Sequence, residues 1–179
     1  MTIENDNQES VTMEFARTAA IALLLSGSLT GAFAETPLPG AIAAPGETIV
    51  LSTHAQGSQV YVCKAGAEGK LAWTFSEPVA TLTAGGKVIG RHYAGPTWEH
   101  VDGSAVVGKV AGSAPGAAAN DIAWLKLEAI SHRGSGVLAD VTTVQRINTL
   151  GGKLDGACDK AGDSRSMPYA ADYVFLRKG

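Results

Sequence analysis

The feature that most limits the fold is a series of short runs, rich in Val, Ile, Thr and aromatic residues, that glycine-containing turns separate. Such runs are typical of β-strands. After residue 34, no stretch repeats apolar residues at the i, i+3, i+4 and i+7 spacing over the length of a helix. We therefore expect strands at residues 48–53, 59–63, 72–75, 79–82, 87–93, 97–101, 105–110, 122–131, 136–149 and 171–176.

The turns between these runs predict how the strands are connected. Gly85-Gly86 and Asp102-Gly103 each separate two apolar runs by only a few residues. Tight hairpins favour these residue types because the turn requires a positive φ angle. We therefore expect an all-β fold, either an antiparallel β-sandwich or a small β-barrel, with long irregular loops.

Two segments lack the strand pattern. Residues 110–120 (VAGSAPGAAAN) are small and featureless, which predicts a mobile loop over one end of the sheet. Residues 150–169 are rich in Gly, Asp and Ser and show no apolar periodicity. We expect this second segment to be irregular.

An export signal is predicted at the N-terminus. Arg17 precedes an apolar run that is too short to cross a bilayer comfortably, and small residues, Ala32 and Ala34, occupy the two positions that a signal peptidase reads. Residues 1–34 are therefore expected to form a signal peptide. Several acids precede Arg17, and Met13 offers a later start, so residues 1–12 are interpreted as an over-extended start. The mature protein is expected to be periplasmic or extracellular.

The remaining residues are enough for one domain. Cleavage after residue 34 leaves 145 residues, too few for two domains of ordinary size. Residues 35–47 contain three prolines and are expected to form an extended arm. Residues 48–179 are expected to form a single β-rich domain.

The charge balance argues against two classes of partner. Removing the four acids and one base of residues 1–34 from the 17 acids and 14 bases of the chain leaves 13 of each. Proteins that bind nucleic acid or anionic membranes rely on clustered Lys and Arg to neutralise phosphates. We therefore expect no nucleic-acid partner, and no membrane partner after signal cleavage.

The two cysteines, Cys63 and Cys158, both lie in the predicted exported part. An oxidising compartment allows a disulfide to form and persist. Neither cysteine belongs to a CxxC or CxxH pattern, which makes a metal site or a reactive thiol the weaker reading. The sequence therefore predicts a Cys63–Cys158 disulfide.

No catalytic or cofactor motif is complete. Residues 103–110 (GSAVVGKV) match a phosphate-binding loop until Val110 replaces the required hydroxyl residue, and residues 134–139 (GSGVLA) match a dinucleotide fingerprint. Both motifs need a following helix, and neither has one in the expected structure. GxSxG and HExxH are absent. We predict no catalytic residue, no metal ligand and no cofactor.

One hairpin concentrates polar and aromatic groups. Residues 91–103 (RHYAGPTWEHVDG) could build a metal site, a general acid/base pair or an aromatic platform for a sugar ring. In the structural alternative, the polar groups cover an exposed sheet face and the tryptophan belongs to the core. The candidate ligand-binding residues are His92, Tyr93, Trp98, Glu99, His100 and Asp102.

Strand pairing decides whether the two histidines of this hairpin share a face. If residues 93–96 form a four-residue loop, His92 lies opposite Thr97 and His100 lies on the other face. A loop that is one residue longer or shorter places both histidines on the same face. The sequence leaves this register open.

Several separated motifs carry a family resemblance over nearly the whole mature chain. They are residues 60–63 (VYVC), Trp73 with Pro78, 90–99 (GRHYAGPTWE), 102–104 (DGS), 123–125 (AWL), 146–152 (RINTLGG) and 169–173 (YAADY). In this order they resemble the domain of unknown function 3455, found in exported bacterial and fungal proteins. The resemblance implies export, a single domain and a β-rich fold, and it carries over no catalytic residues.

Three functions follow from these observations. The first is an exported, non-catalytic β domain that binds a small molecule, a glycan or a partner surface through the six candidate residues. The second is a hydrolytic or metal-dependent enzyme that uses His92, Glu99 and His100. The third is a structural protein of the envelope or matrix.

Overall fold

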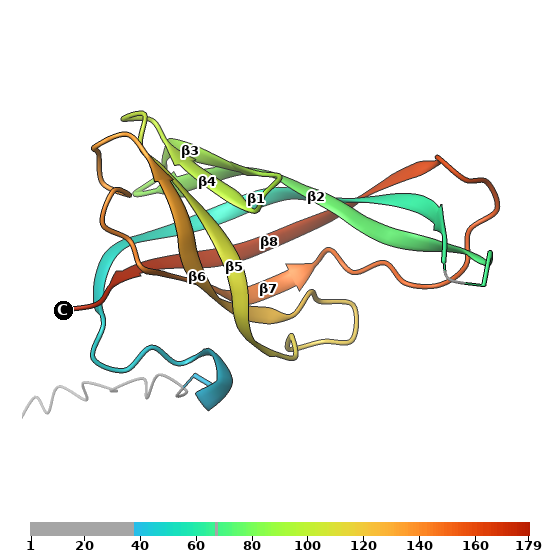
Figure 1. The fold of residues 1–179 in the computed structure, drawn as a ribbon, viewed down its shortest axis with the longest axis horizontal. Coiled ribbons are helices and arrows are strands. Elements are labelled where there is room, and N and C mark those ends of the chain that lie inside the picture. The colour runs from blue at the N-terminus through green and yellow to red at the C-terminus, as the bar shows by residue number, and fades with distance from the viewer. Residues whose placement is uncertain (1–37, 67) are drawn as a thin grey trace, which may run out of the picture. The chain divides into compact units, whose positions relative to one another are not determined.

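Eight antiparallel strands form a closed barrel in which each strand pairs with its sequence neighbours and β8 returns to pair with β1 (Figure 1). The computed structural model describes residues 38–66 and 68–179, so the predicted signal peptide lies outside the described residues. The all-β prediction is confirmed, and the barrel decides between the two expected architectures. The strands are β1 (Thr48–Ala65), β2 (Leu71–Ala84), β3 (Lys87–Tyr93), β4 (Thr97–His100), β5 (Ala105–Ala114), β6 (Trp124–Arg133), β7 (Thr143–Gly151) and β8 (Ser164–Arg177).

Several strands are longer than the residue pattern predicts. β1 joins two predicted strands into one, because its backbone pairs with β8 over residues 48–62 and with β2 over residues 54–65. Paired backbone groups keep the chain extended even where the side chains are small and polar. β8 begins at Ser164, inside a segment that was expected to be irregular. In contrast, residues 136–142 are turn and coil, so the predicted strand at 136–149 begins only at Thr143.

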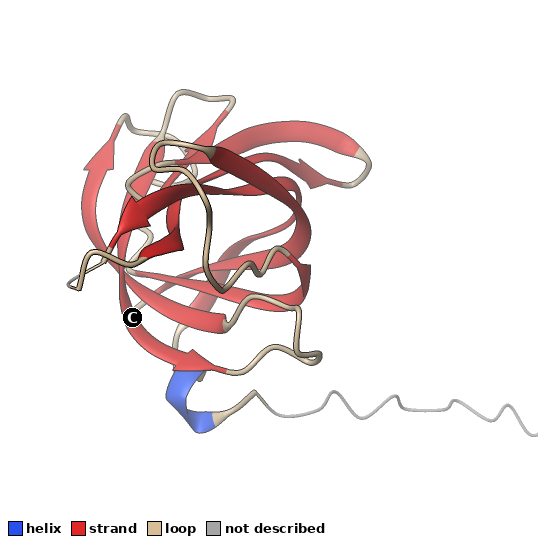
Figure 2. Ribbon diagram, turned by 90° about the vertical axis from the view of Figure 1, so that its right-hand side faces the viewer, coloured by secondary structure: helices blue, strands red, loops and turns tan. Residues whose placement is uncertain are grey.

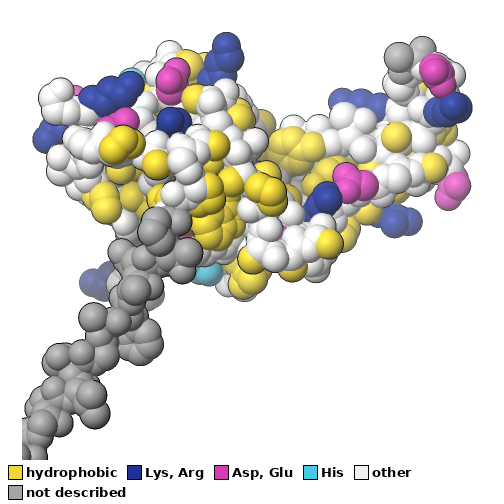
Figure 3. Space-filling view, turned by 90° about the horizontal axis from the view of Figure 1, so that it is seen from below, with side chains coloured by type: hydrophobic (Ala, Val, Ile, Leu, Met, Phe, Trp, Pro, Cys, Tyr) yellow, Lys and Arg dark blue, Asp and Glu magenta, His cyan; other side chains and the backbone are white. Residues whose placement is uncertain are grey.

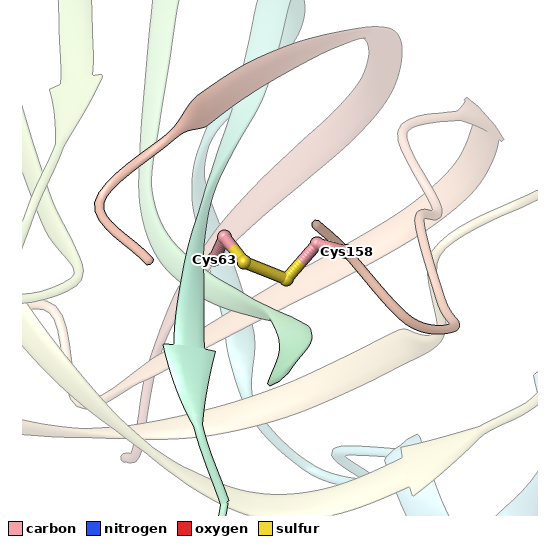
Figure 4. Close-up of a disulfide and its surroundings, with 2 residues drawn as sticks. All are labelled: Cys63 and Cys158. Carbon is pink, nitrogen blue, oxygen red and sulfur yellow. A yellow bond between two sulfur atoms is a disulfide. The ribbon is translucent and has the colours of Figure 1, made fainter. Parts of the chain in front are cut away.

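Strands β1, β2 and β8 continue beyond the barrel as an extension (Figure 1). The predicted disulfide closes this extension: Cys63 of β1 is bonded to Cys158, and their Cα atoms lie 5.9 Å apart (Figure 4). The segment that carries Cys158 also pairs with β2, since the Trp73 N–H donates to the Gly156 carbonyl at 3.1 Å. The irregular segment is thereby fixed to the strands.

The barrel core contains stacked aromatic rings. Trp98 is only 1% exposed, and its ring lies parallel to that of His92 at 4.5 Å between centroids. Tyr173 and Phe175 of β8 meet the Trp98 ring edge to face. A Cβ atom at Gly108 would lie 3.0 Å from the Trp98 ring, so the indole fits because this position of β5 has no side chain. Figure 2 shows how the strands encircle this interior.

The segment that precedes β1 packs onto the barrel. It contains a short 3-10 helix, η1 (Gly40–Ile42), where the sequence predicted an extended arm. Ile42 is fully buried, and its carbonyl accepts a hydrogen bond of 2.6 Å from the Gln145 side chain. A Cβ atom at Gly112 would lie 2.0 Å from the Ala41 carbonyl, so the close approach of η1 to β5 requires glycine there.

The surface of the described residues is mixed in character. In the view of Figure 3, hydrophobic side chains gather near the middle of the face, where the extension leaves the barrel, and charged side chains gather toward the tip of the extension. Within the described ranges, no helix has the length and apolar character needed to span a bilayer.

Candidate functional site

The barrel holds a cavity of about 920 Å³. Eight-stranded barrels are just wide enough to hold one small ligand. Exposed residues, including Phe75 and Val110, lie on its border, so the cavity reaches the surface. Most of the wall is apolar. The main apolar side chains are Phe75, Pro78, Val110, Ile122, Leu125 and Leu127.

The loop between β5 and β6 forms one side of the cavity. The segment expected to be a loop is strand up to Ala114, and residues 115–119 and 121–123 line the cavity. Asp121 holds this loop in place, because its carboxylate accepts the N–H groups of Ala118 at 2.9 Å and Gly151 at 2.6 Å. The small side chains of the loop leave the space beneath it free.

Arg146 of β7 brings a positive charge to the cavity wall. Its Nε and Nη2 atoms donate to the Ala123 carbonyl at 3.0 and 2.9 Å. Among the described residues, no carboxylate oxygen lies within 4.0 Å of this guanidinium. Arg146 is therefore a cation without an acidic partner in the part of the chain that the structure describes.

Other polar groups share the wall with Arg146. Burial raises the pKa of Tyr173, and the nearby Arg146 guanidinium opposes that rise. Gln59 is only 2% exposed, and its Nε2 atom has no hydrogen-bond partner among the described residues. The indole Nε1 of Trp98 is buried without a partner as well. Both nitrogens are inaccessible to solvent, so they lie behind the surface of the cavity, and Arg146 is the donor that the wall presents.

His92 and Trp98 are the two predicted site residues that line the cavity. His92 is 3% exposed, and its Nδ1 donates to the Thr97 carbonyl at 2.8 Å, which leaves Nε2 as the unprotonated nitrogen. Burial, opposed by the hydrogen bond to Thr97 and assisted by the Arg146 charge, lowers the pKa of His92 to about 3. His92 is therefore a neutral wall residue.

Tyr93 and Glu99 belong to a separate network away from the cavity wall. The Glu99 carboxylate accepts the Tyr93 hydroxyl at 2.8 Å, Arg91 Nη2 at 3.0 Å and Arg133 Nη2 at 2.7 Å. The Tyr93 hydrogen bond, followed by those of the two arginines, holds the pKa of Glu99 below its ordinary value. This carboxylate is occupied by three donors within the protein.

His100 and Asp102 form a third group at the β4–β5 turn. Asp102 accepts the Ser104 hydroxyl at 2.6 Å, the Ser104 N–H at 2.8 Å and the Val137 N–H at 2.8 Å. These bonds, the Ser104 hydroxyl above all, lower the pKa of Asp102. The Nδ1 atom of His100 lies 3.0 Å from the same carboxylate. The group ties the turn to the segment that precedes β7.

The register of β3 and β4 differs from the four-residue loop considered above. Tyr93 pairs with Thr97 and His92 pairs with Trp98, so the connecting loop has three residues, 94–96. Strand alternation then places His92 and His100 on the same face. The two side chains nevertheless contact different groups, Thr97 and Asp102. Within residues 38–66 and 68–179, no three His, Cys, Asp or Glu side chains are arranged to hold a metal ion.

The low pKa of His92 predicts a pH-dependent stability. The unfolded chain protonates this histidine near its ordinary pKa of 6.5, whereas the folded protein does so only near 3. The unfolded state therefore binds more protons than the folded state between these two pKa values. The stability that neutral His92 contributes falls as the pH decreases below 6.5. The expected loss is about 1.4 kcal/mol per pH unit, or roughly 2 kcal/mol between pH 6.5 and 5.

Urea unfolding of the wild type and of His92→Asn at pH 7 and pH 5 tests this expectation. Asparagine can keep the donor to the Thr97 carbonyl and cannot titrate. The unfolding free energy of the wild type should fall more between the two pH values than that of the variant. Equal pH dependence of the two proteins would contradict the assignment of His92 as a buried neutral group.

Sequence reasoning missed Arg146 and Gln59 as cavity residues. Arg146 stands two positions after Val144, which is fully buried, so strand alternation places both on the inner face. The two-residue spacing between Arg146 and a core valine was the signal in the sequence. It was not decisive, because the register of a strand with both neighbours decides which of its side chains point into the barrel.

Comparison with known proteins supports the resemblance noted in the sequence. A profile of the family described as Protein of unknown function (DUF3455) matches residues 44–87 and 83–177, which together include all eight strands. No curated protein and no solved structure gives a significant match. The motifs that extend from β1 to β8 and the profile that covers the entire barrel agree, and the chain therefore belongs to the DUF3455 family.

Proposed function

We propose that this protein is an exported, non-catalytic binding protein that holds one small, largely apolar molecule inside its barrel. The observation that carries the proposal is the 920 Å³ cavity, which has an apolar wall and a border at the surface. Small-molecule sites are typically concave, mostly apolar and roughly 300–1,000 Å³ in volume, with a few polar groups that orient the ligand. The cavity fits this description.

The state of the titratable groups favours binding over acid/base catalysis. A general acid or base works best when its pKa lies near the working pH. The pKa of His92 is lowered to about 3, and the carboxylates of Glu99 and Asp102 are occupied by donors within the protein. These groups have structural partners, which supports the non-catalytic proposal.

Export is part of the proposal. The disulfide between Cys63 and Cys158 is compatible with an oxidising compartment, where such bonds persist. The predicted signal peptide and the family resemblance support the same location, in the periplasm or outside the cell. Mass spectrometry of the secreted protein should find a mature N-terminus at Glu35.

Titration with N-phenyl-1-naphthylamine, a neutral apolar fluorophore that brightens in apolar surroundings, tests the binding function. We expect saturable binding of one molecule per chain. Leu125→Trp places a large ring in the cavity and should weaken binding by at least about tenfold. Ile130→Trp is the matched control, because Ile130 lies on the same strand, β6, and its side chain is exposed outside the cavity.

The two variants separate cavity binding from adhesion to surface apolar groups. Ile130→Trp should bind the fluorophore as the wild type does, while Leu125→Trp should not. Circular dichroism establishes that both variants retain the β fold. Absence of saturable binding to the wild type, or equal binding by both variants, would overturn the proposed function.

A further inference from the structure

We infer that the ligand of the cavity carries a carboxylate on an apolar body, and that Arg146 binds this carboxylate. The inference rests on the proposed function and adds the chemical class of the ligand. It starts from the position of Arg146, the partly buried cation of the cavity wall that has no carboxylate within 4.0 Å among the described residues.

The Ala123 carbonyl orients the guanidinium of Arg146, and some of its N–H donors remain free for a ligand. A guanidinium has five N–H donors, and the Ala123 carbonyl accepts from two of its nitrogens, Nε and Nη2. The remaining donors can form the paired hydrogen bonds that match the two oxygens of a carboxylate. Because the Ala123 contact fixes the side chain, little conformational freedom is lost when the ligand binds.

The other charges of the wall leave the anion site open. Asp121, the acid that lines the cavity, already accepts two backbone N–H groups, from Ala118 and Gly151. Lys153 adds a second cation to the lining, 3.3 Å from the exposed Asp155. His92 stays neutral. With Lys153 paired to Asp155 and Asp121 held by backbone donors, Arg146 is the lining charge without an oppositely charged partner among the described residues, which favours an anionic ligand over a cationic one.

The rest of the wall decides the character of the ligand's body. The apolar side chains from Phe75 to Leu127 supply the surface for the rest of the molecule. A monocarboxylate with a hydrocarbon body combines both requirements.

Three ligands with the same twelve-carbon chain test the inference: dodecanoate, 1-dodecanol and dodecylammonium. Displacement of N-phenyl-1-naphthylamine by each ligand measures the dissociation constant of that ligand. We expect dodecanoate to bind the wild type 10- to 100-fold more tightly than 1-dodecanol, and dodecylammonium to bind most weakly. Arg146→Met should remove the preference for dodecanoate while leaving the affinity for 1-dodecanol within about threefold.

Arg177→Met is the matched control, since it removes an exposed arginine that does not line the cavity. It should retain the preference of the wild type for dodecanoate. Equal affinities of the wild type for dodecanoate and 1-dodecanol would overturn the carboxylate assignment and leave the proposed function intact, whether or not Arg146→Met folds. Failure of the wild type to bind the fluorophore or any of the three ligands would overturn the proposed function itself.

An undiminished preference for dodecanoate in Arg146→Met would assign the carboxylate to another cation and overturn the role of Arg146. A variant with both Arg146→Met and Lys153→Met identifies that case, because it would then lose the preference. Arg146→Lys provides a further comparison. It keeps the charge and loses the planar pair of donors, so we expect an intermediate preference for dodecanoate.

Discussion

Replacement of both cysteines by serine should lower the free energy of unfolding by about 4–5 kcal/mol, the chain-entropy value for a closed loop of this length. The disulfide joins Cys63 to Cys158 across a sequence separation of 95 residues. Without it, the unfolded chain gains the freedom that the bond removes. This loss is comparable to the entire stability of many small domains.

The structure indicates which part of the folded protein the loss of the disulfide will affect first. The Cys63 N–H donates to the Asp163 carbonyl at 2.8 Å, and the Cys158 N–H donates to the Leu71 carbonyl at 3.3 Å. These bonds hold the irregular segment between β7 and β8 against the extension. In the cysteine-free variant this segment should separate from the strands first, before the barrel unfolds.

Urea unfolding followed by circular dichroism measures the change, and hydrogen exchange locates it. Amides of residues 156–163 should exchange fastest in the Cys63→Ser/Cys158→Ser variant, while those of β5 and β6 remain protected. Wild-type protein treated with a reducing agent should behave as the variant does. A decrease of less than about 1 kcal/mol would show that the loop-closure estimate does not apply to this chain.

Trp98→Ala should destabilise the protein by about 3–5 kcal/mol, the usual range for removing a large aromatic side chain from a core. Trp98 is 1% exposed and contacts three rings, those of His92, Tyr173 and Phe175. Its loss leaves a void beside Gly108, a position that has no side chain to fill it. The surrounding strands belong to a closed barrel and cannot collapse freely into the space.

Trp73→Ala is the matched control for this prediction. Trp73 is half-buried on the extension, where the Arg165 guanidinium lies 4.9 Å from the centre of its ring. The same truncation should therefore cost much less there. Circular dichroism is the appropriate probe, because both variants alter the tryptophan fluorescence. Equal destabilisation by the two variants would show that Trp98 is not the centre of the core.

The parts of the fold that depend on local chemistry were predictable. β3 spans residues 87–93 as expected, because Gly85-Gly86 and Gly95-Pro96 limit the strand on both sides. The disulfide was predictable because a chain with two cysteines allows a single intramolecular pairing. The continuity of β1 was not predictable. Residues 54–58 carry few strand-forming side chains, and pairing with both β2 and β8 holds them extended.

The candidate site was predictable only in part. His92 and Trp98 stood out by residue type, and both line the cavity. Tyr93, Glu99, His100 and Asp102 stood out for the same reason, but the structure places them in two other groups that make structural contacts. Arg146 was missed because a lone arginine in a strand is typical of a solvated face. Its inward position depends on the pairing of β7 with β6 and β8.

The sequence by itself determined the β-structure, the antiparallel order of neighbouring strands and the partner of each cysteine. These properties depend on residues that are adjacent in the chain or on a pairing without alternatives. Only the tertiary structure decided that β8 closes on β1, that His92 lies opposite Trp98, and that Arg146 reaches the interior. The physical reason is register: a shift of one residue turns every side chain of a strand to the other face, and only contacts between distant segments exclude that shift.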